Sequence, residues 1–175
     1  MGHLKMVVDH VKIDYSGPFS INELVRLIEH FLWERGFDKQ HEKDFEINTQ
    51  SGKNIEWQIS PWKKITDYMQ YIIKIRVLGH DIMKTDLMVD GRKTKVDNGK
   101  VSVVIDGFVQ YDYDNYWDDR PFLYFIRVIY DYFVFKAYSE NFEQRLVHDA
   151  NHLYDQIEKF FNMYRHFSVI SSEKI

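Results

Sequence analysis

The sequence of 175 residues contains no cysteine. This absence excludes a disulfide framework, a zinc site built on thiolates and a cysteine nucleophile. It suits a reducing compartment, and we find no secretory signal peptide at the start of the chain. We therefore expect a cytoplasmic protein.

Long apolar runs are also absent. No window reaches about 18 uninterrupted apolar residues, the usual length of a membrane span. The most apolar segment, residues 121–139, is interrupted by Arg127, Asp131 and Lys136. We expect no transmembrane segment, and peripheral attachment to a membrane through 121–139 is one of the alternative functions.

The net charge of −4 comes without a long run of either sign. Nucleic-acid binding usually requires a basic face, so no nucleic-acid partner is expected. A phosphate loop, a dinucleotide fingerprint and a nucleophile elbow are all missing. The sequence therefore indicates no catalytic residue and no cofactor, and it favours a protein that is not an enzyme.

Aromatic residues are abundant, with 13 Phe, 12 Tyr and 4 Trp. Such residues fill a core, line a pocket or cover an interface. The length predicts one domain, 1–175, that is large enough to bury a core. Residues 1–5 resemble a cloning remnant, and residues 168–175 are expected to form a flexible tail.

Near the N-terminus, alternation predicts a strand over Lys5–Asp14 that ends at Gly17-Pro18. A helix over Ser20–Arg35 follows, with a capping box of Ser20 and Glu23 and with Gly36 as its left-handed stop.

Six further strands joined by short turns are expected to form an antiparallel meander. Glycine-containing pairs mark three of the turns: Gly79-His80, Asp90-Gly91 and Asn98-Gly99. The expected strands cover residues 44–49, 53–60, 65–78, 82–89, 92–96 and 100–111.

Two helical segments are predicted at the C-terminal end. Residues 120–138 suit a helix or a strand, and Asp119 and Pro121 favour a helix. Residues 141–167 carry one apolar stripe at helical spacing, and Asn141 with Gln144 fits a capping box at their start. The stripe consists of Leu146, Ala150, Leu153, Ile157, Phe160 and Tyr164. The predicted fold is α+β, with a strand, a helix, a six-stranded antiparallel meander and C-terminal helices that cover the sheet.

This order of elements resembles the helix-grip fold of the START and Bet v1-like superfamily. The resemblance covers most of the chain as element order and involves no sequence motif. It implies a curved sheet of seven strands around a long C-terminal helix, with an apolar cavity between them for lipids or other hydrophobic ligands. The loop that is glycine-rich in some members is here Gln50-Ser51-Gly52-Lys53, and the helix near 120–138 is additional.

On this basis we expect a non-enzymatic protein that binds a hydrophobic or amphipathic, lipid-like small molecule between the sheet and the C-terminal helices. Arg127 is expected to anchor a carboxylate or phosphate group, paired with Asp131 four residues later. The expected apolar lining consists of Met69, Tyr71, Ile73, Val103, Ile105, Val109 and Tyr111.

The alternative to ligand binding is a structural or protein-interaction module. In that case the aromatic surplus covers an interface, and the 141–167 helix pairs with a protein partner or with a second copy in a homodimer.

Other polar groups favour structural roles. His148 and His152 lie opposite the apolar stripe without a fixed third ligand, so no metal site is predicted there. The acidic residues of 112–119 fit a solvated loop before a helix. Lysines near the two predicted hairpins fit protection of a sheet edge. Gly107 marks either a bulge or a close approach of a helix or ligand.

Overall fold

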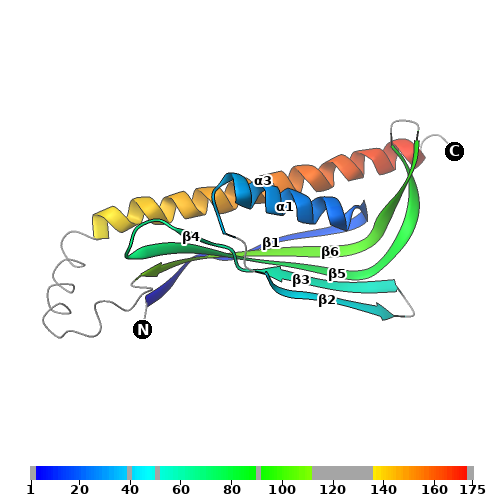
Figure 1. The fold of residues 1–175 in the computed structure, drawn as a ribbon. Helices are drawn as coiled ribbons and strands as arrows, with labels where there is room; N and C mark the ends of the chain where they lie inside the picture. Colours follow the sequence, from blue (N-terminus) through cyan, green and yellow to red (C-terminus); the bar gives the residue numbers. More distant parts are fainter. Residues whose placement is uncertain (1–2, 39–40, 50–51, 90–91, 112–135, 173–175) are drawn as a thin grey trace, which may run out of the picture.

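The computed structural model describes residues 3–38, 41–49, 52–89, 92–111 and 136–172. The fold is α+β, as predicted, with five consecutive strands between the two described helices (Figure 1). Its elements are β1 (His3–Phe19), α1 (Ile21–Glu34), β2 (His41–Thr49), β3 (Gly52–Ile59), β4 (Trp62–Lys64), β5 (Met69–Val89), β6 (Arg92–Tyr111) and α3 (Lys136–Ser172).

All the described strands belong to one antiparallel sheet. Five of them lie side by side in the order β1-β6-β5-β3-β2, and the short β4 pairs with β5. The first strand therefore lies beside the last, with His3 paired to Tyr111. The pairing of β5 with β6 ends at Val89 and Arg92, which is consistent with the hairpin predicted at residues 90–91. Those two residues lie outside the described part.

The bounds of α1 follow from its end signals, as predicted. The Ser20 side chain accepts a hydrogen bond from the Glu23 N–H at 3.4 Å. At the other end, Gly36 adopts φ +72°, and the Phe37 N–H donates to the Leu32 carbonyl oxygen at 2.9 Å. This left-handed stop satisfies carbonyl groups that the last helical turn would otherwise leave unpaired.

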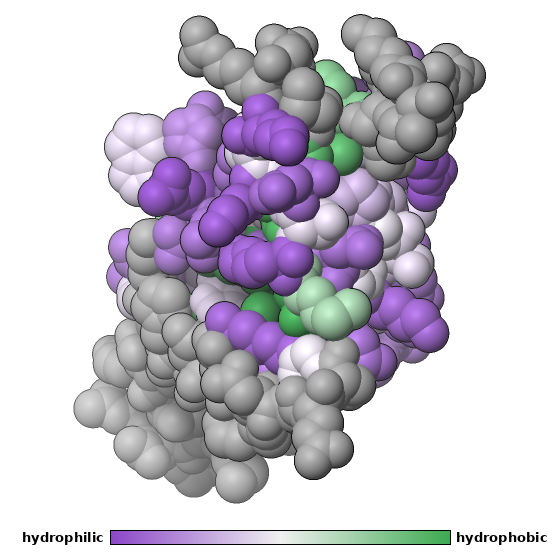
Figure 2. Space-filling model, turned by 90° about the vertical axis from the view of Figure 1, so that its right-hand side faces the viewer, coloured by the Kyte–Doolittle hydropathy of each residue, from purple (hydrophilic) through white to green (hydrophobic). Residues whose placement is uncertain are grey.

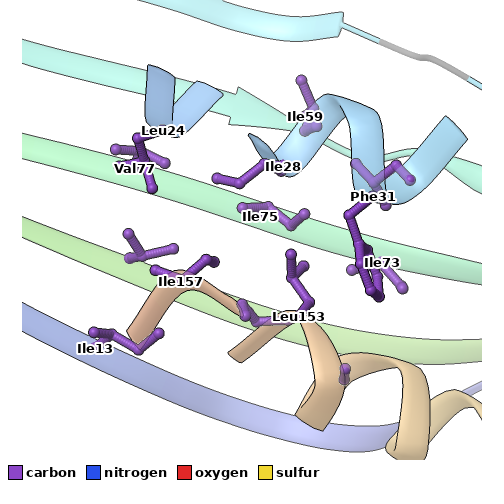
Figure 3. Packing of buried hydrophobic residues seen from close by; sticks show 14 of the residues in the cluster. Ile13, Leu24, Ile28, Phe31, Ile59, Ile73, Ile75, Val77, Leu153 and Ile157 are labelled. Atoms are coloured by element: carbon purple, nitrogen blue, oxygen red, sulfur yellow. The ribbon is translucent and has the colours of Figure 1, made fainter. Parts of the chain in front are cut away.

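Both described helices cover the same face of the sheet (Figure 1). Between them and the strands lies a core of apolar side chains (Figure 3). Ile28 of α1 and Ile75 of β5 point toward each other there, and both are completely buried. On the neighbouring side, Leu153 and Ile157 of α3 lie above β1 and β6.

The helix α3 is longer than predicted. Its apolar stripe from Leu146 to Tyr164 is buried along the sheet, as expected. However, α3 begins at Lys136, so Asn141 lies within the helix and is not its cap. Lys136, Ala137 and Glu140 are good helix formers and allow this extension. At the other end α3 continues to Ser172, so the first five residues of the expected tail are helical.

Two predicted turns are wrong. The strand β5 continues through Gly79-His80, and β6 continues through Asn98-Gly99, so four expected strands are two long ones. A register shift lies between His80 and Met83, where Asp81 adopts φ +53°. A side chain at Gly99 would place its Cβ 2.9 Å from the His80 carbonyl oxygen. The glycine is needed because two backbones approach closely at a β-bulge.

Four neighbouring strands each carry a glycine near this bulge. Gly17 of β1 pairs with Gly99 of β6, next to the β5 bulge after Gly79. On the far side of β5, a Cβ at Gly52 of β3 would lie 2.8 Å from the Asp81 carbonyl carbon. Beyond this line the β5–β6 ribbon bends up beside the C-terminal end of α3 (Figure 1). Most of the described residues seen from this side are hydrophilic (Figure 2). Glycines and bulges at matched positions let a sheet curve.

The ends of two other strands also differ from the prediction. β1 does not stop at Gly17-Pro18 but continues to Phe19, with Pro18 paired to Asn98. A proline is tolerated there because β1 is an edge strand of the described sheet. The strand expected from Ile65 begins at Met69, and Ile65 belongs to the turn between β4 and β5, where its N–H donates to the Met69 carbonyl oxygen.

Gly107 is both a bulge partner and a point of close helix approach. It pairs with Val8, on either side of which the β1 register shifts. A Cβ at Gly107 would lie 2.9 Å from Val8 Cγ2 and 3.6 Å from Leu146 Cδ2 of α3. The glycine thus lets β1 and α3 meet above β6.

Candidate functional site

The structure brings the predicted apolar lining together on β5 and β6. Tyr71 pairs with Val109, and Met69 pairs with Tyr111. All seven residues belong to the core between sheet and helices, and none is more than 8% exposed. Arg127 and Asp131, the expected polar anchor and its partner, lie outside the described residues.

The lining becomes polar toward the N-terminal end of α3. The Tyr71 hydroxyl donates to the Phe142 carbonyl oxygen at 2.7 Å, and the Tyr111 hydroxyl donates to Glu143 Oε1 at 3.0 Å. Lys5 Nζ also binds Glu143, at 2.7 Å. Two of the predicted residues therefore hold this part of α3 on the sheet.

A pocket of about 800 Å³ opens beside these contacts. It lies between the C-terminal end of α1 and the first turns of α3, and Phe142 links it to Tyr71. The residues that line it are Arg35, Asn141, Phe142, Gln144, Arg145, His148 and Asp149.

Arg35 lies at the C-terminal end of α1, where contacts of its backbone and its guanidinium hold it in the pocket. It is the C-cap residue before Gly36, and its carbonyl oxygen accepts a hydrogen bond from Lys63 Nζ at 2.6 Å. Its guanidinium binds the Asp149 carboxylate of α3 and lies 5.3 Å from the centre of the Phe31 ring. The side chain of Asp149 is only 12% exposed, so this ion pair also joins α1 to α3.

Arg145 presents a second guanidinium on α3. It is exposed and stacks over the Phe142 ring at 5.4 Å. Burial raises the pKa of the Tyr71 phenol to about 12, and the positive charge of Arg145 opposes part of that rise. The lining carries two arginines and one aspartate, which is a net charge of +1 with a neutral His148.

Smaller pockets also lie elsewhere on the described part. One of about 520 Å³ lies between α1 and β3, and one of about 150 Å³ lies between β1 and α3. Neither these pockets nor the one at Arg35 is lined by any of the seven predicted apolar residues.

Of the other polar groups, His148 and His152 are exposed on α3, on the side opposite its stripe as predicted, and their rings lie 6.5 Å apart. Lys93, Lys95 and Lys100 are exposed along β6. The acidic residues of 112–119 lie outside the described ranges.

Sequence reasoning missed Arg35 and Arg145 as members of one site. Arg35 stands just before the glycine stop of α1, a position that orients its side chain beyond the helix end. Arg145 lies on the polar side of the α3 stripe, like several other charged residues. The pairing of these two positions depends on how α1 packs against α3, and neither spacing nor composition contains that information.

Comparisons with protein-family models, with curated proteins and with solved structures found no match to this chain. Neither described helix contains a stretch that is both long and apolar enough to span a membrane.

Proposed function

We propose that the chain binds a lipid-like amphipathic molecule, without catalysis, between its sheet and α3 in a helix-grip-like arrangement. The observation that carries this proposal is the pocket of Arg35 and Arg145. It lies between the C-terminal end of α1 and α3, and one of its lining residues, Phe142, accepts a hydrogen bond from the Tyr71 hydroxyl.

The charges of the pocket favour an acidic head group. The two positive charges of Arg35 and Arg145 outnumber the one negative charge among the lining residues, that of Asp149. Hydrogen bonds from guanidinium to carboxylate or phosphate are stronger than those between neutral groups. Asn141 and Gln144 add amide donors beside them. A head group here takes the role that the sequence suggested for Arg127.

The topology supports the apolar half of the proposal. β1 pairs with β6, and α3 runs across the sheet (Figure 1). In the helix-grip arrangement, the apolar part of the ligand lies against the strands under this helix. The predicted lining residues on β5 and β6 occupy that face, and Tyr71 connects it to the pocket through Phe142.

The alternative of a protein-interaction module loses part of its basis. It relied on an aromatic surface and on the 141–167 helix, and the apolar stripe of this helix is buried against the sheet of the same chain. The alternative of membrane attachment depends on 121–139, where no side chain is described.

Binding of laurate and of dodecanol to the purified chain tests the proposal, because the two share a tail and differ in charge. Native mass spectrometry of the chain as purified, compared with its denatured mass, first shows whether a ligand of lipid size is already bound. After removal of any such ligand, both compounds are titrated by calorimetry. We expect laurate to bind more tightly than dodecanol.

Arg145→Gln should weaken laurate binding about tenfold, because hydrogen bonds to charged groups contribute about 1.5–3 kcal/mol. Its effect on dodecanol should be small. Arg26→Gln, at an exposed arginine on α1 away from the Arg35 pocket, is the matched control and should leave both affinities unchanged. If neither compound binds, or if the two variants behave alike, the proposal is wrong.

A further inference from the structure

The face of the sheet opposite the helices carries a buried carboxylate. Ile105 and Gly107 of β6 face the core, so Asp106 between them points to the other side. Its side chain is only 4% exposed. A charged group is rarely buried in this way without specific partners.

The two oxygens of Asp106 have different partners. Oδ2 accepts a hydrogen bond from Arg76 Nη2 of β5 at 2.9 Å. Oδ1 accepts one from the backbone N–H of His10 at 2.9 Å, and it lies 3.4 Å from Nδ1 of the His10 ring. Arg76 thus orients the carboxylate, and Oδ1 remains directed at the imidazole.

The bulge in β1 places His10 there. The register shifts between Val8 and Val11, and His10 lies between them with φ +48°. This left-handed conformation is uncommon for a residue with a side chain. It turns both the N–H and the ring of His10 toward Asp106, and it brings Asp9 Oδ1 to 2.5 Å from His10 Nδ1.

We propose that Asp9, His10 and Asp106 bind a divalent transition-metal ion, with Zn²⁺ as the best fit. One nitrogen and two carboxylate oxygens of these residues lie within 4.8 Å of one another, the one such group of three found among the described residues. Two zinc bonds of about 2.0–2.1 Å at a tetrahedral angle separate their ligand atoms by about 3.3 Å. The distance of 3.4 Å between His10 Nδ1 and Asp106 Oδ1 agrees with this value. The 2.5 Å between His10 Nδ1 and Asp9 Oδ1 is shorter, so the exposed Asp9 side chain would move outward to bind the ion.

The chemistry of the group favours zinc over magnesium or calcium. Mg²⁺ and Ca²⁺ prefer oxygen ligands throughout, whereas a mixed set of imidazole and carboxylates suits zinc. The ion would replace the proton between His10 and Asp9, and water would complete the coordination. Arg76 would act as an outer partner that fixes one ligand carboxylate.

This site is independent of the proposed lipid binding, because it lies on the opposite face of the sheet from the Arg35 pocket. Zinc binding at this site must be distinguished in solution from zinc binding at other histidines. His148 and His152 of α3 form an exposed pair four residues apart, and His30 lies 3.3 Å from Glu34 on α1. Each of these pairs supplies two ligands, fewer than a specific zinc site requires.

Calorimetric titration of the full chain with ZnCl₂, and with MgCl₂ for comparison, tests the proposal. His10→Asn is the informative variant, because asparagine tolerates the left-handed conformation and keeps the N–H bound to Asp106. The double variant His148→Asn/His152→Asn is the matched control. Asp9→Asn removes a second ligand at a side chain that is 75% exposed, so the fold should persist.

We expect one Zn²⁺ per chain and no comparable binding of Mg²⁺. His10→Asn and Asp9→Asn should each weaken zinc binding at least tenfold, since even outer-shell changes commonly cost 10–100-fold. The α3 double variant should bind as the unaltered chain does. Cobalt substitution should give a visible absorption band that His10→Asn abolishes. The proposal is wrong if the chain does not bind zinc. It is also wrong if both ligand variants bind zinc as tightly as the unaltered chain, or if the α3 double variant loses zinc binding.

Discussion

Gly107→Ala is expected to destabilise the fold, although the same change in an open strand would be favourable. Glycine costs about 0.5–1 kcal/mol relative to alanine within regular structure. Here, however, the new Cβ would lie 2.9 Å from Val8 Cγ2 and 3.0 Å from Val8 Cβ. Valine is stiff about its first torsion and cannot rotate away easily. Overpacking of this kind costs about 1–3 kcal/mol, so we expect a net loss of about 1–2 kcal/mol.

A double-mutant cycle isolates the contact. Val8→Ala alone removes two methyl groups from a residue that is only 5% exposed and should also destabilise the chain. The double variant removes the contact with Val8 Cγ2, while the 3.0 Å contact with the Cβ at position 8 remains. The combined loss should therefore be smaller than the sum of the single losses by about 0.5–1 kcal/mol. Urea unfolding followed by circular dichroism measures all four proteins, and constant slopes would show that the unfolded states are comparable. A neutral or stabilising Gly107→Ala, or strictly additive losses, would refute the argument.

Three further predictions concern the packing of the helices and are measured in the same assay. Leu153→Ala should cost about 2–5 kcal/mol, because this leucine is completely buried under α3, and a loss below about 1 kcal/mol would contradict its placement. Ser20→Ala should cost about 0.5–2 kcal/mol by removing the cap of α1, whereas Ser20→Asp should retain the stability. Tyr71→Phe should cost about 0.5–1.5 kcal/mol at pH 7, because it removes the hydrogen bond to Phe142. The folded chain keeps the Tyr71 proton up to a pKa of about 12, whereas the unfolded phenol loses it near 10. The unaltered chain should therefore lose stability relative to Tyr71→Phe between pH 10 and 12, and a constant difference over that range would contradict the burial of the phenol.

The ends of α1 and the buried stripe of α3 were predictable because their signals are local. Ser20 and Gly36 mark the ends of α1 through contacts within a few residues, and the α3 stripe follows from spacing alone. The strand ends were harder to predict, because Gly79 and Gly99 look like turn residues in sequence. They serve instead to let two backbones meet at a bulge, and that requirement appears only when β5 and β6 are paired.

In the candidate sites too, local features were predictable and contacts between distant elements were not. The apolar face of β5 and β6 was predicted from alternation, because alternation decides which side chains face a core. One partner of Arg35 and one partner of Asp106 lie more than 90 residues away in sequence. Asp149 binds Arg35, and His10 binds Asp106. Asp106 did leave a signal, as a lone acid within an apolar strand beside Gly107. Its contact with His10 depends on a bulge in β1 that the alternating pattern did not reveal.

The pairing of β1 with β6 also has a consequence for synthesis of the chain. His3 finds its partner only when Tyr111 has been made, and Phe19 must wait for Asp97. Contacts between such distant positions make folding slow, because a long loop must close before they form. Until then the apolar residues of β1, among them Val8 and Ile13, have no strand beside them and no α3 above them. A nascent chain that stops before β6 therefore presents an unpaired apolar strand, the kind of surface on which chaperones act.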